Sequence, residues 1–189
     1  MKEKKFPLIT VIMIGVMAAM VYIVTLFRFP LLGSKVHFAN AVCLLAGLLL
    51  GPVPGGLAAG LGSMLYDAFA GYGLVEALIT FVSKFAMAWV CGRLYQGLGD
   101  FTLKKLDKTL LSCILGALTY VALYMLKTFI FQRFVYGFPM DTVFATMLSK
   151  LIPSLINAGA AVVAAPIFFH ALVPALRSGG VMDMLRPAH

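Results

Sequence analysis

Ionisable and amide side chains recur at intervals in a sequence that is otherwise strongly apolar. Groups of this kind inside a membrane are costly, and they usually face the interior of a helix bundle or a polar cavity, where they bind ligands or ions. We expect most of them in the outer half of a membrane bundle, around a polar pocket open to the outside. The set comprises Asp67, Glu76, Lys84, Lys127 and Lys150, with His37, Asn40 and Asn157 as further polar residues.

The charged members of this set have alternative roles. Glu76, Lys127 and Lys150 lie near the ends of predicted spans, where long side chains can also extend to the lipid headgroups. Lys84 lies about ten residues inside its span. We therefore expect Lys84 either to line the pocket or to form an ion pair with Asp67, whose own role is then structural.

The uncharged members also have two interpretations. Asn157 is either a ligand contact or an interhelical hydrogen-bonding group, a common role for amides in membrane bundles. His37 is either a pocket residue or an interfacial histidine. The large aromatic residues act either as packing and membrane-interface residues or as surfaces that stack on a ligand; they are Tyr66, Tyr72, Trp89, Tyr120 and Tyr124.

Catalytic and metal-binding patterns are weak in this sequence. Ser63 in "GLGSM" invites comparison with intramembrane serine proteases, but the only candidate base in a later span, His170, falls at the opposite end of the predicted bundle. The sequence has no Gly-Lys-Ser phosphate-binding loop and no HExxH or carboxylate-histidine cluster. Its three cysteines are isolated in apolar runs. We predict no catalytic residues, no bound metal and no resident cofactor.

The elements that position these residues must be membrane-spanning helices. Of the 189 residues, 62% are hydrophobic and 12% are charged, and the mean hydropathy is +1.00. A soluble domain of this length could not bury so much apolar surface, so the surroundings are largely the lipid bilayer. The net charge of +8 is explained by its placement in loops, not by nucleic-acid binding.

About twenty apolar residues are needed for each span. The sequence predicts one all-α membrane domain over residues 1–189, a compact bundle of six helices at about 7–27, 38–50, 54–70, 75–97, 109–131 and 152–175. The first span is too long for a secretory signal core. "GPVPGG" predicts a tight turn in which Gly51 ends one helix and Pro54 opens the next. The apolar region at about 142–176 predicts a short helix that precedes the sixth span.

Six spans put both termini on one side of a plasma membrane. If that side is cytoplasmic, it holds nine basic residues and the outside holds three, as the positive-inside rule requires. The inner set is Lys2, Lys4, Lys5, Arg93, Lys104, Lys105, Lys108, Arg177 and Arg186, and the outer set is Arg28, Lys35 and Arg133. We see no internal repeat of the kind typical of self-sufficient secondary transporters, which remain an alternative class.

The hairpin at residues 35–72 carries a resemblance to a known family. The phrase "LLAGLLLGPVPGGLAAGLGSML" followed by Asp67, six short helices, a long first loop "RFPLLGSKVHF" and a basic loop together resemble the S component of energy-coupling factor (ECF) vitamin transporters. The resemblance implies that the chain binds a vitamin without altering it. It also implies three partner subunits, which are a transmembrane coupling subunit and two ATPases.

The resemblance further implies roles for particular residues. On the first span, Gly15 and Ala19 form a small-xxx-small pair that allows another helix to approach closely, and the resemblance assigns them to docking of the coupling subunit. The loop from Pro30 to Phe38 corresponds to a gate. The implied ligand site comprises His37, Asn40, Lys84, Tyr124, Lys127, Lys150 and Asn157.

The substrate is less well defined by the resemblance. The nearest subfamily is the riboflavin type, whose sixth helix carries a phrase like "IPFNIIKG". This chain has "IPSLINAG", with Leu155 and Ala158 in place of the Asn and Lys and with Asn157 as the nearest polar substitute. A flavin-like vitamin is the first expectation, and another micronutrient such as cobalamin is the alternative.

Overall fold

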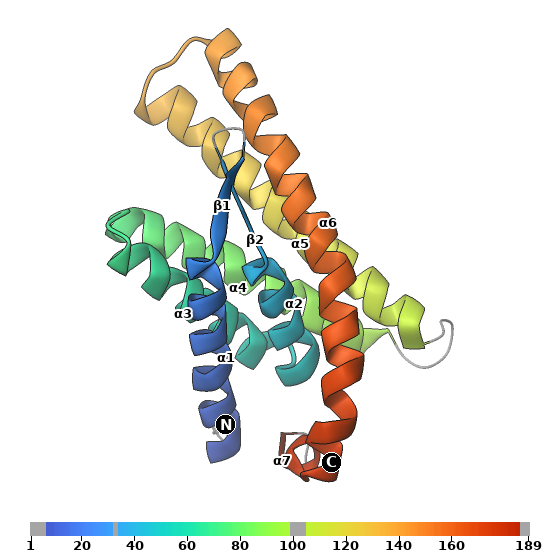
Figure 1. The fold of residues 1–189 in the computed structure, drawn as a ribbon. Coiled ribbons are helices and arrows are strands. Elements are labelled where there is room, and N and C mark those ends of the chain that lie inside the picture. The colour runs from blue at the N-terminus through green and yellow to red at the C-terminus, as the bar shows by residue number, and fades with distance from the viewer. Residues whose placement is uncertain (1–6, 32–33, 99–104, 186–189) are drawn as a thin grey trace, which may run out of the picture.

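A computed structural model of the chain describes residues 7–31, 34–98 and 105–185. Six main helices dominate it, and a two-stranded hairpin follows the first of them (Figure 1). The elements are α1 (Leu8–Leu26), β1 (Arg28–Leu31), β2 (Ser34–His37), α2 (Ala39–Leu50), α3 (Pro52–Phe69), α4 (Leu74–Gly97), α5 (Lys105–Ile130), a π-helical turn (Phe131–Val135), α6 (Met140–Ser178) and α7 (Val181–Leu185). The predicted all-α membrane bundle is confirmed, with the hairpin as an addition.

Within the described ranges, four helical segments are long and apolar enough to cross a membrane, namely Leu8–Leu26, Leu74–Gly97, Lys108–Val135 and Met140–Ser178. By contrast α2 has 12 residues, which at 1.5 Å per residue span about 18 Å, well short of a hydrocarbon core of about 30 Å. Eleven of its residues are buried. α2 is therefore the central helix of the bundle, surrounded by the other helices.

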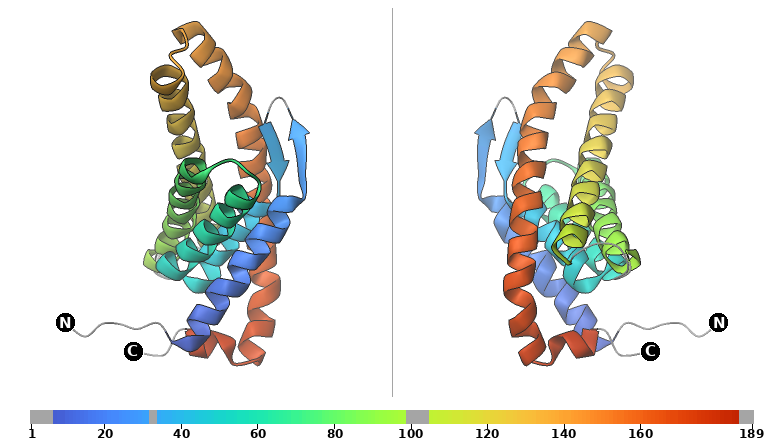
Figure 2. Two further views of the ribbon diagram at one scale, coloured as in Figure 1. Left: turned by 90° about the vertical axis from the view of Figure 1, so that its left-hand side faces the viewer. Right: turned by 90° about the vertical axis from the view of Figure 1, so that its right-hand side faces the viewer.

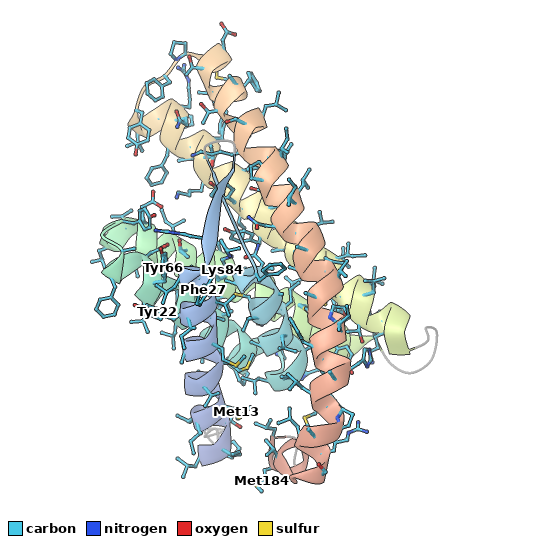
Figure 3. The ribbon with its side chains drawn as sticks, viewed as in Figure 1. Met13, Tyr22, Phe27, Tyr66, Lys84 and Met184 are labelled. Carbon is cyan, nitrogen blue, oxygen red and sulfur yellow. The ribbon has the colours of Figure 1, made fainter. Side chains whose placement is uncertain are left out.

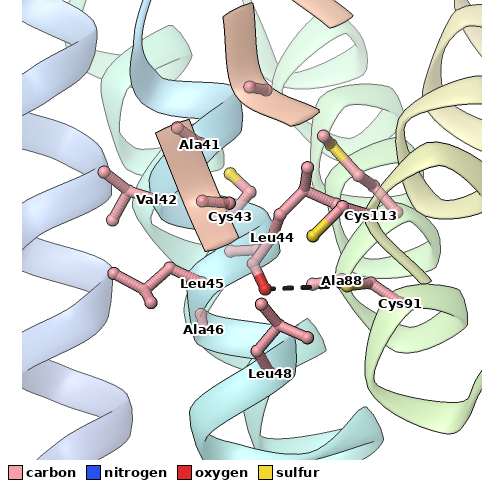
Figure 4. Packing of buried hydrophobic residues seen from close by; sticks show 14 of the residues in the cluster. Ala41, Val42, Cys43, Leu44, Leu45, Ala46, Leu48, Ala88, Cys91 and Cys113 are labelled. Atoms are coloured by element: carbon pink, nitrogen blue, oxygen red, sulfur yellow. Dashed lines mark hydrogen bonds between the residues drawn. The ribbon is translucent and has the colours of Figure 1, made fainter. Parts of the chain in front are cut away.

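The core forms around α2 because its side chains are apolar on every face. Leu44, Leu45 and Leu48 are almost fully buried there, together with Cys91 of α4 and Cys113 of α5 (Figure 4). Glycine permits the closest contact: a Cβ added at Gly47 would overlap the backbone of Ala88 on α4. Small residues thus allow α2 and α4 to pack backbone to backbone, as in many membrane bundles.

The turn between α2 and α3 lies at Gly51, as the sequence predicts. Gly51 has a φ of +86°, and its N–H donates to the carbonyl of Gly47 at 3.0 Å. Such a left-handed conformation favours glycine. α3 begins at Pro52 and not at the expected Pro54, because proline is well tolerated at the first helical position, where its missing N–H costs nothing.

The expected break before the sixth span is wrong. α6 is one helix of 39 residues, about 58 Å long, and it contains Pro153, Pro166 and Pro174. Proline is tolerated inside membrane helices because neighbouring groups compensate for the lost hydrogen bond. The first part of α6 and the end of α5 extend together beyond the other helices (Figures 1 and 2).

A two-stranded hairpin forms where the sequence predicts a loop. β1 and β2 pair antiparallel, with Arg28 opposite His37 and Leu31 opposite Ser34. The predicted gate, residues 30–38, therefore coincides with part of this hairpin, although its residues 32 and 33 lie outside the described residues. β2 packs against α6.

α1 begins and α7 ends at the same end of the molecule (Figure 2), and α7 contacts α1. This arrangement agrees with termini on one side of a membrane and does not identify the side. Five residues of the predicted inner set lie outside the described residues, namely Lys2, Lys4, Lys5, Lys104 and Arg186.

Candidate functional site

A cavity of about 290 Å³ lies among the hairpin and helices α3, α4, α5 and α6. Figure 3 places two of its lining residues, Tyr66 and Lys84, near the middle of the molecule, whereas Met13 and Met184 lie towards the end with the termini. The cavity is lined mainly by polar and aromatic side chains, although the surrounding bundle is apolar.

Each helix supplies its lining residues from one face. In α4 they are Glu76, Thr80 and Lys84, and in α6 they are Lys150, Ser154 and Asn157. Steps of three or four residues place side chains one above another on a helix. The same spacing recurs in the remaining walls, with Tyr120, Tyr124 and Lys127 on α5 and Ser63, Tyr66 and Asp67 on α3.

Lys84 is the most deeply buried charge in the cavity wall, at 4% exposure. Its ammonium donates to Asn40 Oδ1 of α2 and lies 3.6 Å from the centre of the Tyr120 ring. Both partners are neutral. The amide nitrogen of Asn40 is buried and has no hydrogen-bond partner among the described residues.

A second lysine, Lys127 of α5, is compensated by a carboxylate. Its ammonium forms an ion pair with Glu76 of α4, and the two side chains are 23% and 30% exposed. The pair joins α4 to α5 at the cavity wall. One turn before Lys127, Tyr124 stacks on Tyr120 with ring centres 6.1 Å apart and planes at 19°. α5 therefore presents an aromatic surface beside two cations.

Arg28, at the start of the hairpin, joins the opposite wall. Its guanidinium lies 4.9 Å from the centre of the Tyr66 ring and 5.9 Å from that of Tyr72. Nη1 also donates to the Tyr72 hydroxyl at 3.0 Å. These contacts hold the first strand against α3 and the turn that follows it.

The second strand is attached to α6. The backbone N–H of His37 donates to Asn157 Oδ1 at 2.9 Å, and both residues line the cavity. Asn157 is 93% buried, with 7% exposure. Arg28 and His37, which pair at the base of the hairpin, thus contact two different walls of the cavity, one formed by α3 and the other by α6.

The structure brings together most of the residues that the sequence singles out. All of the expected ligand residues except Asn40 line this cavity, namely His37, Lys84, Tyr124, Lys127, Lys150 and Asn157. Asn40 lies behind the wall as the partner of Lys84. Their contact with a ligand stays a prediction.

The expected ion pair between Asp67 and Lys84 is wrong as a direct contact. Both residues line the cavity, but among the described residues the one ion pair within 4 Å is that of Lys127 with Glu76. The Lys84 ammonium donates instead to the amide oxygen of Asn40 on α2.

The predicted docking pair on α1 lies away from the cavity. Gly15 and Ala19 are both exposed on α1, outside the cavity lining. A Cβ added at Gly15 would meet no described atom within 4 Å. The pair sits in an apolar exposed face with Ile12, Val16 and Ile23.

Several lining residues were not predicted as ligand residues. Five of them had no expected role at the cavity, namely Thr25, Arg28, Ser63, Thr80 and Ser154. The others had packing, interfacial or headgroup roles as alternatives, and they are Tyr66, Tyr72, Glu76 and Tyr120. The available signal was the spacing of polar residues along each helix, because 76, 80 and 84 or 150, 154 and 157 fall on a single face. Arg28 had no such signal, since its placement depends on the hairpin.

Neither metal nor triad chemistry finds support in the described part of the chain. No group of three or more His, Cys, Asp or Glu residues there could hold a metal ion. Ser63 lines the cavity, whereas His170 is exposed on α6 and is not part of the lining.

Two comparisons with known proteins match the chain. Residues 5–174 match the family described as the ECF-type riboflavin transporter S component. A solved structure, reported as "Structure and mechanism of the S component of a bacterial ECF transporter", superposes with a TM-score of 0.68 at 16% identity, covering 89% of this chain and 97% of that one. At this identity the second match concerns the fold alone. No curated protein matches the chain significantly.

Proposed function

The chain belongs to the family of ECF-type riboflavin transporter S components, and we propose that its cavity captures a water-soluble vitamin or vitamin precursor for import across the plasma membrane. Members of this family are substrate-binding subunits of transporters and not enzymes. S components work with a membrane coupling subunit and ATPases, and we propose the same partners for this chain. Both termini are then cytoplasmic, and the hairpin faces outside.

The observation that carries the proposal is the cavity beneath the hairpin. Ligand sites are typically concave, roughly 300–1,000 Å³ in volume, with a few placed polar groups. Here about 290 Å³ is lined by stacked tyrosines, charged side chains and amides in an otherwise apolar bundle. Polar groups of this kind are costly inside a membrane and indicate a functional site.

The volume bears on the substrate. A flavin-like vitamin remains the first expectation from the family. A cavity of about 290 Å³ favours a compact, single ring system over a corrinoid, whose macrocycle and side chains are several times bulkier. This argument disfavours the cobalamin alternative.

Coupling is proposed to use the exposed face of α1. Gly15 and Ala19 are exposed there, and a Cβ added at Gly15 would meet no described atom from another helix within 4 Å. Small residues allow helix backbones to approach, so this face suits a helix of the coupling subunit.

Reconstitution tests the proposal directly. The purified chain alone in proteoliposomes should bind a vitamin without accumulating it, whereas addition of the coupling subunit, the ATPases and ATP should give uptake. Mass spectrometry of the detergent-purified chain identifies the bound compound. Uptake by the chain alone would contradict the proposal and support a self-sufficient secondary transporter.

A further inference from the structure

We propose that the ligand of this cavity is an aromatic compound with an anionic group, a carboxylate or a phosphate, which pairs with Lys84 and is attracted by the cation excess of the cavity. The inference rests on the proposed function and narrows its substrate class. A neutral flavin would leave the charge of the cavity unbalanced.

The charge balance of the cavity wall is the first argument. The described lining residues include four cations, Arg28, Lys84, Lys127 and Lys150, against two carboxylates, Asp67 and Glu76. Glu76 is already paired with Lys127. Arg28, Lys84 and Lys150 then remain against Asp67, which forms no ion pair within 4 Å with a described residue. The ligand-free cavity therefore has an excess of positive charge.

The surroundings of Lys84 are the second argument. A buried charge is costly unless it is paired, and removing a lysine from water is compensated only in part by neutral partners. Lys84 is 4% exposed, and its partners are the amide oxygen of Asn40 and the ring face of Tyr120. An ammonium has three donors, and the side chain lines the cavity. An anion in the cavity would supply the missing opposite charge.

The aromatic walls indicate the rest of the ligand. Tyr120 and Tyr124 are stacked on α5, and Tyr66 and Tyr72 lie on another wall around Arg28. Aromatic side chains favour offset or edge-on contacts with a planar ring. The cavity volume suits one compact ring system. An aromatic acid or a phosphorylated aromatic vitamin satisfies both the charge and the shape.

Matched probe pairs test this inference. The full chain in detergent is titrated with benzoate and benzamide, nicotinate and nicotinamide, and flavin mononucleotide and riboflavin, with thermal stabilisation and calorimetry as readouts. A charge-assisted hydrogen bond in a buried site predicts that the anionic member of a binding pair is favoured roughly tenfold or more. In the Lys84→Gln variant, which keeps a donor for Asn40, this preference should fall to about twofold or less.

A matched control is available at the other end of the bundle. Lys108 also lies over a tyrosine ring, with its ammonium 5.2 Å from the centre of Tyr95, but it does not line the cavity. Lys108→Gln should keep the full preference. If Lys84→Gln does not fold, Lys150→Gln on α6 serves the same test, because it removes another cavity cation.

The outcomes separate the two proposals. Equal or tighter binding of the neutral members, or a preference that persists in the folded lysine variants, would overturn the anionic ligand and leave the S-component function intact. A neutral or cationic vitamin co-purifying with the chain would do the same. If no probe binds and no compound co-purifies from cells, both the proposed function and this inference are contradicted.

Discussion

Replacing Gly15 by leucine should separate docking from folding and from ligand binding. Gly15 is exposed on α1, and a Cβ added there would meet no described atom within 4 Å. Leucine is favoured over glycine in a helix by about 0.8 kcal/mol. For a chain of 189 residues, this gain corresponds to a rise in Tm of about 2–3 °C. The variant should therefore fold and bind ligand normally.

Association with the coupling subunit should nevertheless be lost. Close helix contacts require small residues at the crossing point, and a leucine side chain holds the two backbones apart. The assay is co-purification of the chain with a tagged coupling subunit, measured beside thermal unfolding and ligand binding in detergent. We expect little or no co-purification and no vitamin uptake.

Gly62 of α3 provides the matched control for the same substitution. A Cβ at Gly62 would lie 2.8 Å from Val21 Cβ and would overlap the carbonyl of Ala18, both on α1. Overpacking of this kind costs about 3 kcal/mol, so Gly62→Leu should lower Tm by roughly 6 °C or more. The reasoning is refuted if the Gly15→Leu chain co-purifies with the coupling subunit at the wild-type yield, or if it is destabilised as strongly as Gly62→Leu.

Three further predictions concern the cavity wall. Asn157→Leu removes the acceptor of the β2 backbone N–H, a loss of about 1–3 kcal/mol, and should speed ligand release roughly fivefold or more in stopped-flow measurements. The control is Ser154→Ala, because the Ser154 hydroxyl bonds within α6. Equal release rates in the two variants would argue against a hairpin held by α6. Glu76→Gln leaves Lys127 without its partner and should lower Tm by about 2–4 °C, since such a partly exposed pair contributes about 1 kcal/mol. The double variant with Lys127→Gln should recover part of this loss. An unchanged Tm in the single variant would mean that the ion pair does not stabilise the fold. Lys84→Met should leave the Tm of the ligand-free chain equal or higher, because a buried cation with neutral partners is replaced by an apolar side chain. A drop in Tm of several degrees would contradict the claim that the buried Lys84 charge costs stability without a ligand.

The hydropathy of the chain was sufficient to predict the six-helix bundle, because apolar runs and turn residues are local signals. The turn at Gly51 is an example, since Gly-Pro chemistry determines it within a few residues. The continuity of α6 was not predictable in this way. Pro153 is a helix breaker by local rules, and the neighbouring helices that compensate for it are remote in sequence.

The candidate site was predictable in its composition and not in its pairings. Lys84, Lys150 and Asn157 could be singled out because polar residues in apolar helices are unusual. The partner of Lys84 depends on how α2 crosses α4, and Asn40 is 44 residues away in the sequence. Residue types and periodicity indicate which face of a helix is polar, but the crossing angles of the helices decide which polar groups meet.

The shortness of α2 has a consequence for how the chain enters the membrane during synthesis. A helix of 12 residues cannot hold its two ends at opposite lipid surfaces, and in the folded chain it has almost no contact with lipid. The turn at Gly51 joins it directly to α3. We therefore expect α2 and α3 to enter the membrane together as one helical hairpin. α2 then gains its final surroundings only when α4, α5 and α6 have been synthesised and have packed around it.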